Sequence, residues 1–185
     1  MRCATQVGPL YFNRREIDVK IEARKALPAP SLDAIKNLEA AIKVNLPQEY
    51  IDLLEVMNGA YIQENIFDVP GGNNAGVSQF IPFDKIIYCK SLIEQTGPKK
   101  FLPFAYASGG NYVCLSIRER EFGVVYFFDH EVPGVKALTK IAPSLSKFFD
   151  VLRPFSVDDV ELDPNDVGEV WIDPDFLKKI KGDVN

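Results

Sequence analysis

The stretch that decides the fold is residues 104–130, FAYASGGNYVCLSIREREFGVVYFFDH. Large apolar side chains occupy alternate positions on both sides of the turn at Gly109-Gly110-Asn111, which is typical of β-strands that turn one face to a core. Residues 124–128 are apolar or aromatic at every position, which predicts a central strand that is covered on both faces. We therefore expect a sheet built around this stretch.

Two amphipathic helices are expected upstream of it. The first follows Ser31, whose hydroxyl can cap a helix, and its apolar residues have near-helical spacing: Leu32, Ile35, Leu38 and Ile42. The second begins at Leu46-Pro47, because proline suits the first helical position, and its apolar residues are Tyr50, Leu53, Leu54 and Met57. Asn58-Gly59 is expected to end it, since glycine readily adopts the left-handed conformation after a helix.

The remaining elements are inferred from composition and breaker residues. Residues 70–76, PGGNNAG, are expected to form a flexible loop. A short helix is expected to end at Gly97-Pro98, and a short strand is expected at residues 135–139. A last helix begins at Pro143 and closes at Arg153-Pro154. The predicted fold is α+β, a single domain with a central antiparallel β-sheet flanked by helices.

The two ends of the chain differ from the middle. Residues 1–30 are expected to be an N-terminal arm, in which residues 17–21 alternate like a short edge strand. Residues 31–152 are expected to form the core domain, a size that a chain of 185 residues allows. Residues 153–185 are expected to be an acidic extension. Within it, residues 154–177 contain no Lys or Arg but hold eight carboxylates: Asp158, Asp159, Glu161, Asp163, Asp166, Glu169, Asp173 and Asp175.

Composition argues against several classes of protein. No apolar run approaches the roughly 18–20 residues needed to cross a bilayer, and no secretory signal opens the chain, so a cytoplasmic protein is expected. Cys3, Cys89 and Cys114 are far apart and form no CxxC pair, so reduced thiols are expected. The formal net charge of −5 disfavours nucleic acid as the main partner, because phosphate binding requires a basic face.

Acid–base catalysis by histidine would have to rest on His130, the only histidine. Ser108 and Asp129 belong to the same stretch, but there is no GxSxG motif, and adjacent Asp and His side chains on a strand point to opposite faces. A small His-dependent enzyme is kept as an alternative. No cofactor or metal is predicted, because a calcium loop read from Asp159 meets Pro164 where glycine is needed, and the Gly-Gly pairs fit turns better than phosphate loops.

Several short motifs occur in the order and spacing of a known family. They are Leu38-Glu39, Leu46-Pro47 with Tyr50, Asn58-Gly59, Leu102-Pro103-Phe104-Ala105, Gly109-Gly110-Asn111-Tyr112, Val125-Tyr126 and Asp129-His130. Over residues 31–152 the chain resembles the SUKH superfamily, which is named partly for the Smi/Knr-type regulators of fungal cell-wall synthesis. The resemblance implies an α+β domain that is not an enzyme.

The resemblance also implies a protein partner. Many bacterial members look like immunity proteins that bind and block a toxin nuclease or deaminase, whereas others are thought to be adaptors or regulators, and both readings stay open. The acidity of the chain favours a basic toxin domain as the partner. Aromatic anchors and polar residues of the hairpin form the candidate partner-binding set: Tyr61, Asn111, Tyr112, Asp129, His130 and Trp171.

The other motif residues are expected to be structural: Glu39, Leu46, Pro47, Tyr50, Asn58, Gly59, Gly109 and Gly110. Glu39 lies beside the apolar stripe of the first helix. Its partly buried carboxylate therefore requires a hydrogen-bond donor, for which a backbone amide is suited.

Overall fold

The computed structural model describes residues 23–63 and 65–156, and its main feature is a six-stranded antiparallel sheet. Each strand pairs with the next one along the chain, so the sheet is a meander: β3 (Ile66–Asp68), β4 (Asn74–Phe80), β5 (Phe101–Ala107), β6 (Tyr112–Ser116), β7 (Val125–Phe128) and β8 (Leu138–Ala142). A separate two-stranded sheet pairs β1 (Ala23–Arg24) with β2 (Tyr61–Ile62). Sheets and helices together confirm the predicted α+β class.

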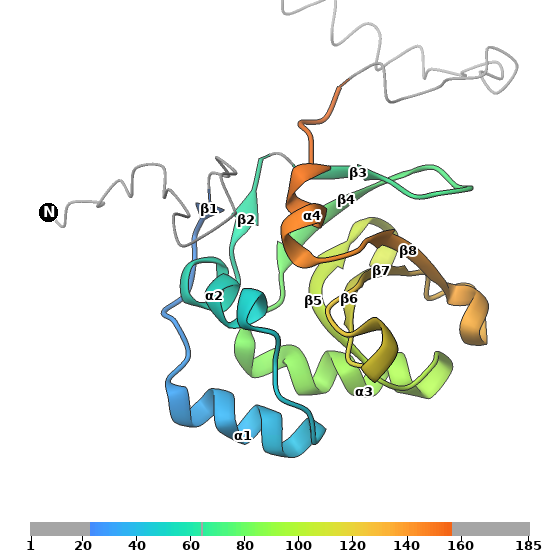
Figure 1. Ribbon diagram of the computed structural model, residues 1–185. Helices are drawn as coiled ribbons and strands as arrows, with labels where there is room; N and C mark the ends of the chain where they lie inside the picture. Colours follow the sequence, from blue (N-terminus) through green and yellow to red (C-terminus); the bar gives the residue numbers. More distant parts are fainter. Residues whose placement is uncertain (1–22, 64, 157–185) are drawn as a thin grey trace, which may run out of the picture. The chain divides into compact units, whose positions relative to one another are not determined.

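The helices of the described residues are α1 (Leu32–Ile42), α2 (Gln48–Met57), α3 (Ile86–Thr96) and α4 (Leu145–Asp150). In Figure 1, α1 and α3 lie at the bottom of the view, and α2 and α4 lie above them. Ser31 caps α1 as predicted, because its Oγ accepts a hydrogen bond from Ala34 N at 3.2 Å. Within the two described ranges, no helix has the length and apolar character needed to cross a membrane.

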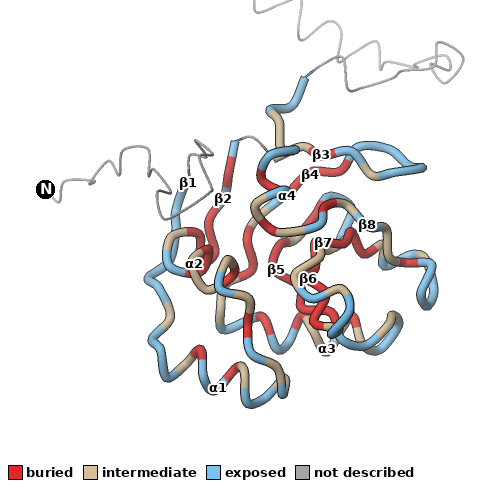
Figure 2. Tube along the Cα trace, in the orientation of Figure 1, coloured by how far each residue is buried: buried red, intermediate tan, exposed pale blue. Residues whose placement is uncertain are grey.

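The side chains of β6 and β7 alternate between two hydrophobic clusters. The larger cluster also contains buried residues of α1, α2 and α4, and it receives four side chains of these strands: Val113, Leu115, Val125 and Phe127. The smaller cluster contains Ile93 of α3 and receives three side chains of these strands: Cys114, Tyr126 and Phe128. Every residue of β7 is buried, as the red trace in Figure 2 shows, which confirms the predicted central strand.

β5 is an interior strand although it contains Pro103, which has no N–H to donate. The register between β5 and β6 shifts between Pro103 and Ala105. This irregularity accommodates the proline, because prolines inside sheets are confined to edges, strand starts and bulges. Gly109 and Gly110 then reverse the chain with φ of 74° and 83°, the left-handed region that favours glycine.

Asn58 joins three segments at the end of α2. Its buried side chain donates from Nδ2 to Pro28 O at 2.6 Å and accepts at Oδ1 from Phe83 N at 2.8 Å. Its backbone carbonyl accepts from Leu27 N at 2.7 Å. Gly59 follows with φ of 65°, and a Cβ at this position would lie 2.9 Å from Leu27 Cδ1. The Asn58-Gly59 step ends α2 as predicted and also fixes the preceding chain to the turn before α3.

Two carboxylates of the first two helices accept hydrogen bonds from distant backbone amides. Glu39 Oε1 accepts from Leu46 N at 2.7 Å, which is the backbone donor expected for this side chain. Glu49 Oε2 accepts from Leu145 N at 3.1 Å and from Ser146 N at 3.4 Å. The Glu49 carboxylate thus satisfies two backbone amides at the start of α4 that have no partner within the helix, and it fixes α2 against α4.

The expected loop at residues 70–76 is wrong in its second half, because β4 begins at Asn74. Gly76 lies inside this strand, where a Cβ would come within 3.1 Å of Ser108 Oγ and 3.2 Å of Ile66 Cδ1. The glycine thus permits a close approach between neighbouring segments, rather than flexibility.

The expected strand at residues 135–139 is displaced towards the C-terminus. Gly134–Ala137 form a 3-10 helix, and β8 begins at Leu138. Ala137 O accepts from Asp129 N at 2.8 Å, so the short helix is fixed to the end of β7. This tertiary contact overrides the local composition and the Pro133-Gly134 break on which the expectation rested.

The chain after α4 returns to the sheet. Arg153 and Ile66 exchange two backbone hydrogen bonds, of 2.9 and 3.0 Å, which cover part of the outer edge of β3. Arg153 Nη2 also lies 3.1 Å from Asp68 Oδ1. The strand expected at residues 17–21, Trp171 and the eight carboxylates lie outside the described residues.

Tyr50 carries a buried hydroxyl for which the described residues supply no hydrogen-bond partner. Its side chain is 1% exposed, and its ring lies edge-on to Phe104. A buried, unpaired hydroxyl costs roughly 1–3 kcal/mol. We expect Tyr50→Phe to raise the free energy of unfolding by about 1 kcal/mol, as measured by urea denaturation.

Tyr126→Phe is the matched control, because Tyr126 Oη donates to Glu121 Oε1 at 2.8 Å. Removing this paired hydroxyl is expected to lower the free energy of unfolding by about 1 kcal/mol. Equal destabilisation by Tyr50→Phe and Tyr126→Phe would contradict the unpaired state of the Tyr50 hydroxyl.

Candidate functional site

Four of the predicted partner-binding residues lie at one end of β6 and β7. Tyr112 and Phe128 are paired across these strands, with Asn111 before the first and Asp129 and His130 after the second. Asn111 Oδ1 accepts from His130 N at 3.0 Å and lies 2.8 Å from His130 Nδ1. Because an amide oxygen can only accept, this contact places a proton on Nδ1. We call Asn111, Asp129 and His130 the hairpin end.

The hairpin end does not contain a Ser-His-Asp relay. Ser108 Oγ accepts from a backbone N–H of β4 at 3.1 Å, and Asp129 Oδ1 accepts from Glu131 N at 3.0 Å. His130 is bonded instead to Asn111. Within the described part of the chain, none of Ser108, Asp129 and His130 forms a hydrogen bond with another of the three.

A row of aromatic rings continues from the hairpin end across the sheet. Tyr106 of β5 and Tyr112 of β6 are cross-strand partners with ring centres 5.8 Å apart, and both are half-buried. Tyr112 in turn lies 6.4 Å from Phe128 of β7. Tyr88 of α3 is 62% exposed and lies close enough to Tyr112 to raise its pKa. We call Tyr88, Tyr106 and Tyr112 the tyrosine surface.

Burial is the main cause of the raised pKa of Tyr106 and Tyr112, so both hydroxyls stay protonated at neutral pH. For Tyr106, the contact between its Oη and Cys89 Sγ at 3.4 Å adds to the effect, and for Tyr112 the next contribution is the Cys89 charge. Each residue therefore presents a neutral hydroxyl beside an apolar ring, a combination that suits a protein interface.

Carboxylates lie near one tyrosine of the tyrosine surface and in the turn after β7. Asp129 and Glu131 belong to the turn after β7, and Asp84, which contributes to the raised pKa of Tyr106, pairs with Lys85 at 3.2 Å. The described residues contain no cluster of three or more His, Cys, Asp or Glu side chains that could hold a metal ion.

The two other predicted partner-binding residues are not part of this arrangement. Tyr61 belongs to β2 in the two-stranded sheet, where Lys25 Nζ lies 5.9 Å from its ring centre. Trp171 lies outside the described residues. Tyr88 and Tyr106, which were not among the predicted partner-binding residues, lie near Tyr112 and are added to the candidate set.

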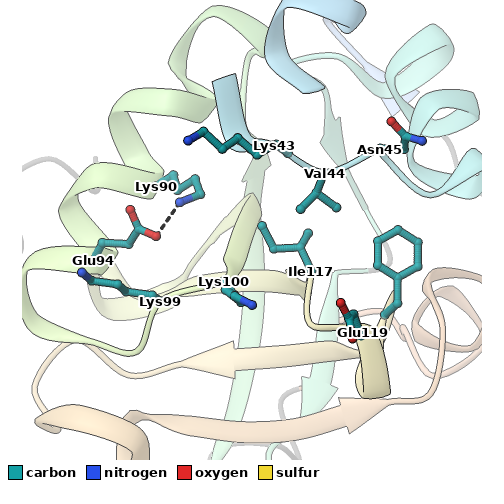
Figure 3. Close-up of a pocket in the computed structure, with 11 residues that line it drawn as sticks. Lys43, Val44, Asn45, Lys90, Glu94, Lys99, Lys100, Ile117 and Glu119 are labelled. Atoms are coloured by element: carbon teal, nitrogen blue, oxygen red, sulfur yellow. Dashed lines mark hydrogen bonds and ion pairs between the residues drawn. The ribbon is translucent and has the colours of Figure 1, made fainter. Parts of the chain in front are cut away.

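A separate pocket of about 880 Å³ lies between the end of α1, the second half of α3 and the connection after β6 (Figure 3). Its apolar lining is Ile42, Val44, Ile117 and Phe122, and its lysines are Lys43, Lys90, Lys99 and Lys100. In Figure 3, Glu119 lies across the pocket from Lys90 and Glu94 of α3. We call it the lysine pocket.

Sequence reasoning missed the lysine pocket because its basic residues come from distant positions. Each of Lys43, Lys90 and Lys99 looks like an ordinary solvated charge when it is read with its neighbours. A usable signal was Lys99-Lys100 directly after Gly97-Pro98, since two adjacent lysines follow a helix end there.

One comparison decides the family. Residues 29–151 match the model of the SMI1 / KNR4 family (SUKH-1). The chain belongs to the SMI1 / KNR4 family. The matched range contains both the tyrosine surface and the lysine pocket. A search of curated proteins finds no match for the chain.

Membership in the SMI1 / KNR4 family confirms the resemblance to the SUKH superfamily that the sequence motifs indicated. It supports a non-enzymatic domain of the immunity-protein or regulator kind, with a protein as the partner.

The contact between Asn111 and His130 is expected to hold the hairpin end in place. Asn111→Ala removes the acceptor of the His130 backbone N–H, and one lost hydrogen bond of about 1 kcal/mol corresponds to about fivefold faster amide exchange at His130. Hydrogen exchange followed by NMR measures this rate. Asn111→Asp is the control, because it keeps an oxygen acceptor and should preserve protection. An unchanged rate in Asn111→Ala would show that the contact does not order the hairpin end.

Proposed function

We propose that this chain is an immunity protein that binds a cognate protein toxin in the cytoplasm and blocks it. The contact surface in this proposal is the tyrosine surface together with the hairpin end. The observation that carries it is the gathering of three partly or largely exposed tyrosines, with Asp84 near Tyr106, on a SUKH-1 domain. Cys89 and Cys114 are free thiols, which agrees with a reducing compartment.

The tyrosine surface has the physical properties of an interface anchor. Tyr106 and Tyr112 are held by each other and by Cys89, so binding requires little further ordering of their side chains. Tyr88 projects from α3 and offers a large ring that a partner can bury. Two ordered rings and one projecting ring give a partner both a preformed contact and a protruding one.

A basic toxin domain is the proposed partner, and the charge that attracts it is unevenly placed. Residues 154–177 carry eight carboxylates, which exceeds the formal net charge of −5 for the whole chain. The other residues therefore sum to a positive formal charge. We propose that residues 154–177 accelerate the encounter with a basic toxin and that the tyrosine surface provides the lasting contacts. A nuclease or deaminase that acts on nucleic acid carries such a basic surface.

The test uses the toxin encoded beside the gene, co-expressed with this chain and then purified with it. Tyr88→Ala is expected to weaken the complex by about 2 kcal/mol, or about 30-fold in Kd, measured by isothermal titration calorimetry. Tyr61→Ala is the matched control, because it removes an exposed tyrosine from the other sheet and should leave Kd unchanged. A host that expresses the toxin should grow with the unmodified chain or with Tyr61→Ala, and it should grow less well with Tyr88→Ala.

A failure of the chain to bind or neutralise the adjacent toxin would overturn the immunity proposal. Loss of affinity in Tyr61→Ala but not in Tyr88→Ala would retain immunity and move the contact to the two-stranded sheet.

The second candidate function is an adaptor or regulator that holds two proteins at once. The observation that favours it is the lysine pocket, which offers a basic surface made of residues other than those of the tyrosine surface. Deletion of residues 157–185 distinguishes the two functions. For a toxin inhibitor, the deletion should lower the association rate with the toxin and leave the dissociation rate unchanged, as measured by surface plasmon resonance. For an adaptor that uses the acidic extension as its second contact, the deletion should abolish capture of the partner that binds there and leave binding at the lysine pocket intact.

A further inference from the structure

The lysine pocket contains ammonium groups that the rest of the domain does not neutralise. Lys90 is paired with Glu94 on the next turn of α3. Lys43, Lys99 and Lys100 have no ion pair within residues 23–63 and 65–156. Three positive charges without an ion pair among the described residues therefore line one pocket.

Two of these lysines lie at backbone positions that favour glycine. Lys43, which directly follows α1, has φ of 58°, and Lys100 has φ of 70°. Among the described residues, Lys25 is the one other non-glycine residue with a positive φ. A side chain at such a position adds backbone strain that glycine would relieve. The pocket thus keeps an ammonium group at two places where the backbone alone would select glycine.

The floor of the pocket is apolar. Val44 and Ile117 lie beside each other in Figure 3, with Lys43 above them and Lys100 below, and Phe122 lines the same pocket with 45% of its surface exposed. An apolar floor beside several positive charges matches a ligand that carries apolar groups next to anionic ones. A volume of about 880 Å³ holds several side chains and far exceeds the space needed for an inorganic anion.

We propose that the lysine pocket binds an extended acidic segment of a partner protein. An apolar side chain of that segment lies on Val44, Ile117 and Phe122, and its flanking carboxylates contact the ammonium groups of Lys43, Lys99 and Lys100. This binding site goes beyond the toxin contact, because it uses other residues and takes a partner of the opposite charge.

Nucleic acid fits the pocket less well than an acidic peptide. Glu94 and Glu119 also line the pocket, and a phosphate backbone would have to pass these carboxylates. A peptide can place an uncharged residue at each of these points. A nucleic-acid backbone also offers no aliphatic side chain that could pack on the apolar floor.

The probe is a fluorescein-labelled nonapeptide in which Asp or Glu alternates with Leu, titrated with the full chain and followed by fluorescence anisotropy. We expect saturable binding that weakens as salt is added. Lys43→Gly and Lys100→Gly should each lower the affinity about threefold, because each removes one exposed charge pair. Their thermal unfolding midpoints should stay equal or rise, since glycine relieves the positive φ.

Lys25→Gly is the matched control for these variants. It also replaces a lysine at positive φ, but Lys25 contacts Tyr61 and does not line the pocket, so the affinity for the peptide should stay unchanged.

Phe122→Ala tests the apolar floor of the pocket. It should weaken the Leu-containing peptide several-fold and leave a peptide with Ala in place of Leu unaffected.

Absence of saturable binding would overturn the proposal, and so would equal affinities for Lys43→Gly, Lys100→Gly and Lys25→Gly. A single-stranded oligonucleotide of matched charge that binds more tightly than the peptide, with the same dependence on Lys43 and Lys100, would assign the pocket to nucleic acid instead and also overturn it. Neither outcome bears on the toxin contact, which is tested with Tyr88→Ala.

Discussion

The buried side-chain amide of Asn58 is the interaction on which both surfaces depend. It accepts from Phe83 N at the turn that leads into α3 and donates to Pro28 O of the preceding chain. Both groups would lose their partner if the amide were replaced by an apolar side chain, at a cost of roughly 1–3 kcal/mol each. α3 begins three residues after Phe83 and carries Tyr88 on the tyrosine surface and Lys90 in the lysine pocket. The amide at the end of α2 thus sets where α3 starts.

The elements that could be predicted from sequence are those whose pattern is local. α1, α2 and the strands around residues 104–130 each repeat an apolar period that one buried face requires, and the structure confirms them. The expected loop at residues 70–76 was wrong in its second half, and the expected strand at residues 135–139 was displaced, because distant contacts decide those segments. Gly76 permits close packing with Ser108, and the backbone of Ala137 is tied to the end of β7. No local periodicity reports either contact.

In the candidate site, too, the parts that depend on local pattern could be predicted, whereas the parts that depend on distant contacts could not. Asn111 and His130 could be placed together from sequence because a hairpin pairs neighbouring strands, and their two contacts lie where that topology puts them. Tyr88 could be selected only as one aromatic among several, since its position beside Tyr112 depends on how α3 packs on the sheet. The lysine pocket depends on three separate elements, so each of its charges looked like a solvated side chain.

Whole-chain charge is a poor guide to the partner of this protein, because opposite charges are segregated. The eight negative charges of residues 154–177 exceed the formal net charge of −5, so the rest of the chain is positive overall. The described domain contains the lysine pocket, in which three lysines have no ion pair among the described residues. Tyr88 and Lys90 lie two positions apart on α3, which separates their side chains by about 200° around the helix axis. One helix therefore presents the tyrosine surface on one side and the basic pocket on the other. The two proposed ligands would therefore contact different side chains of this domain.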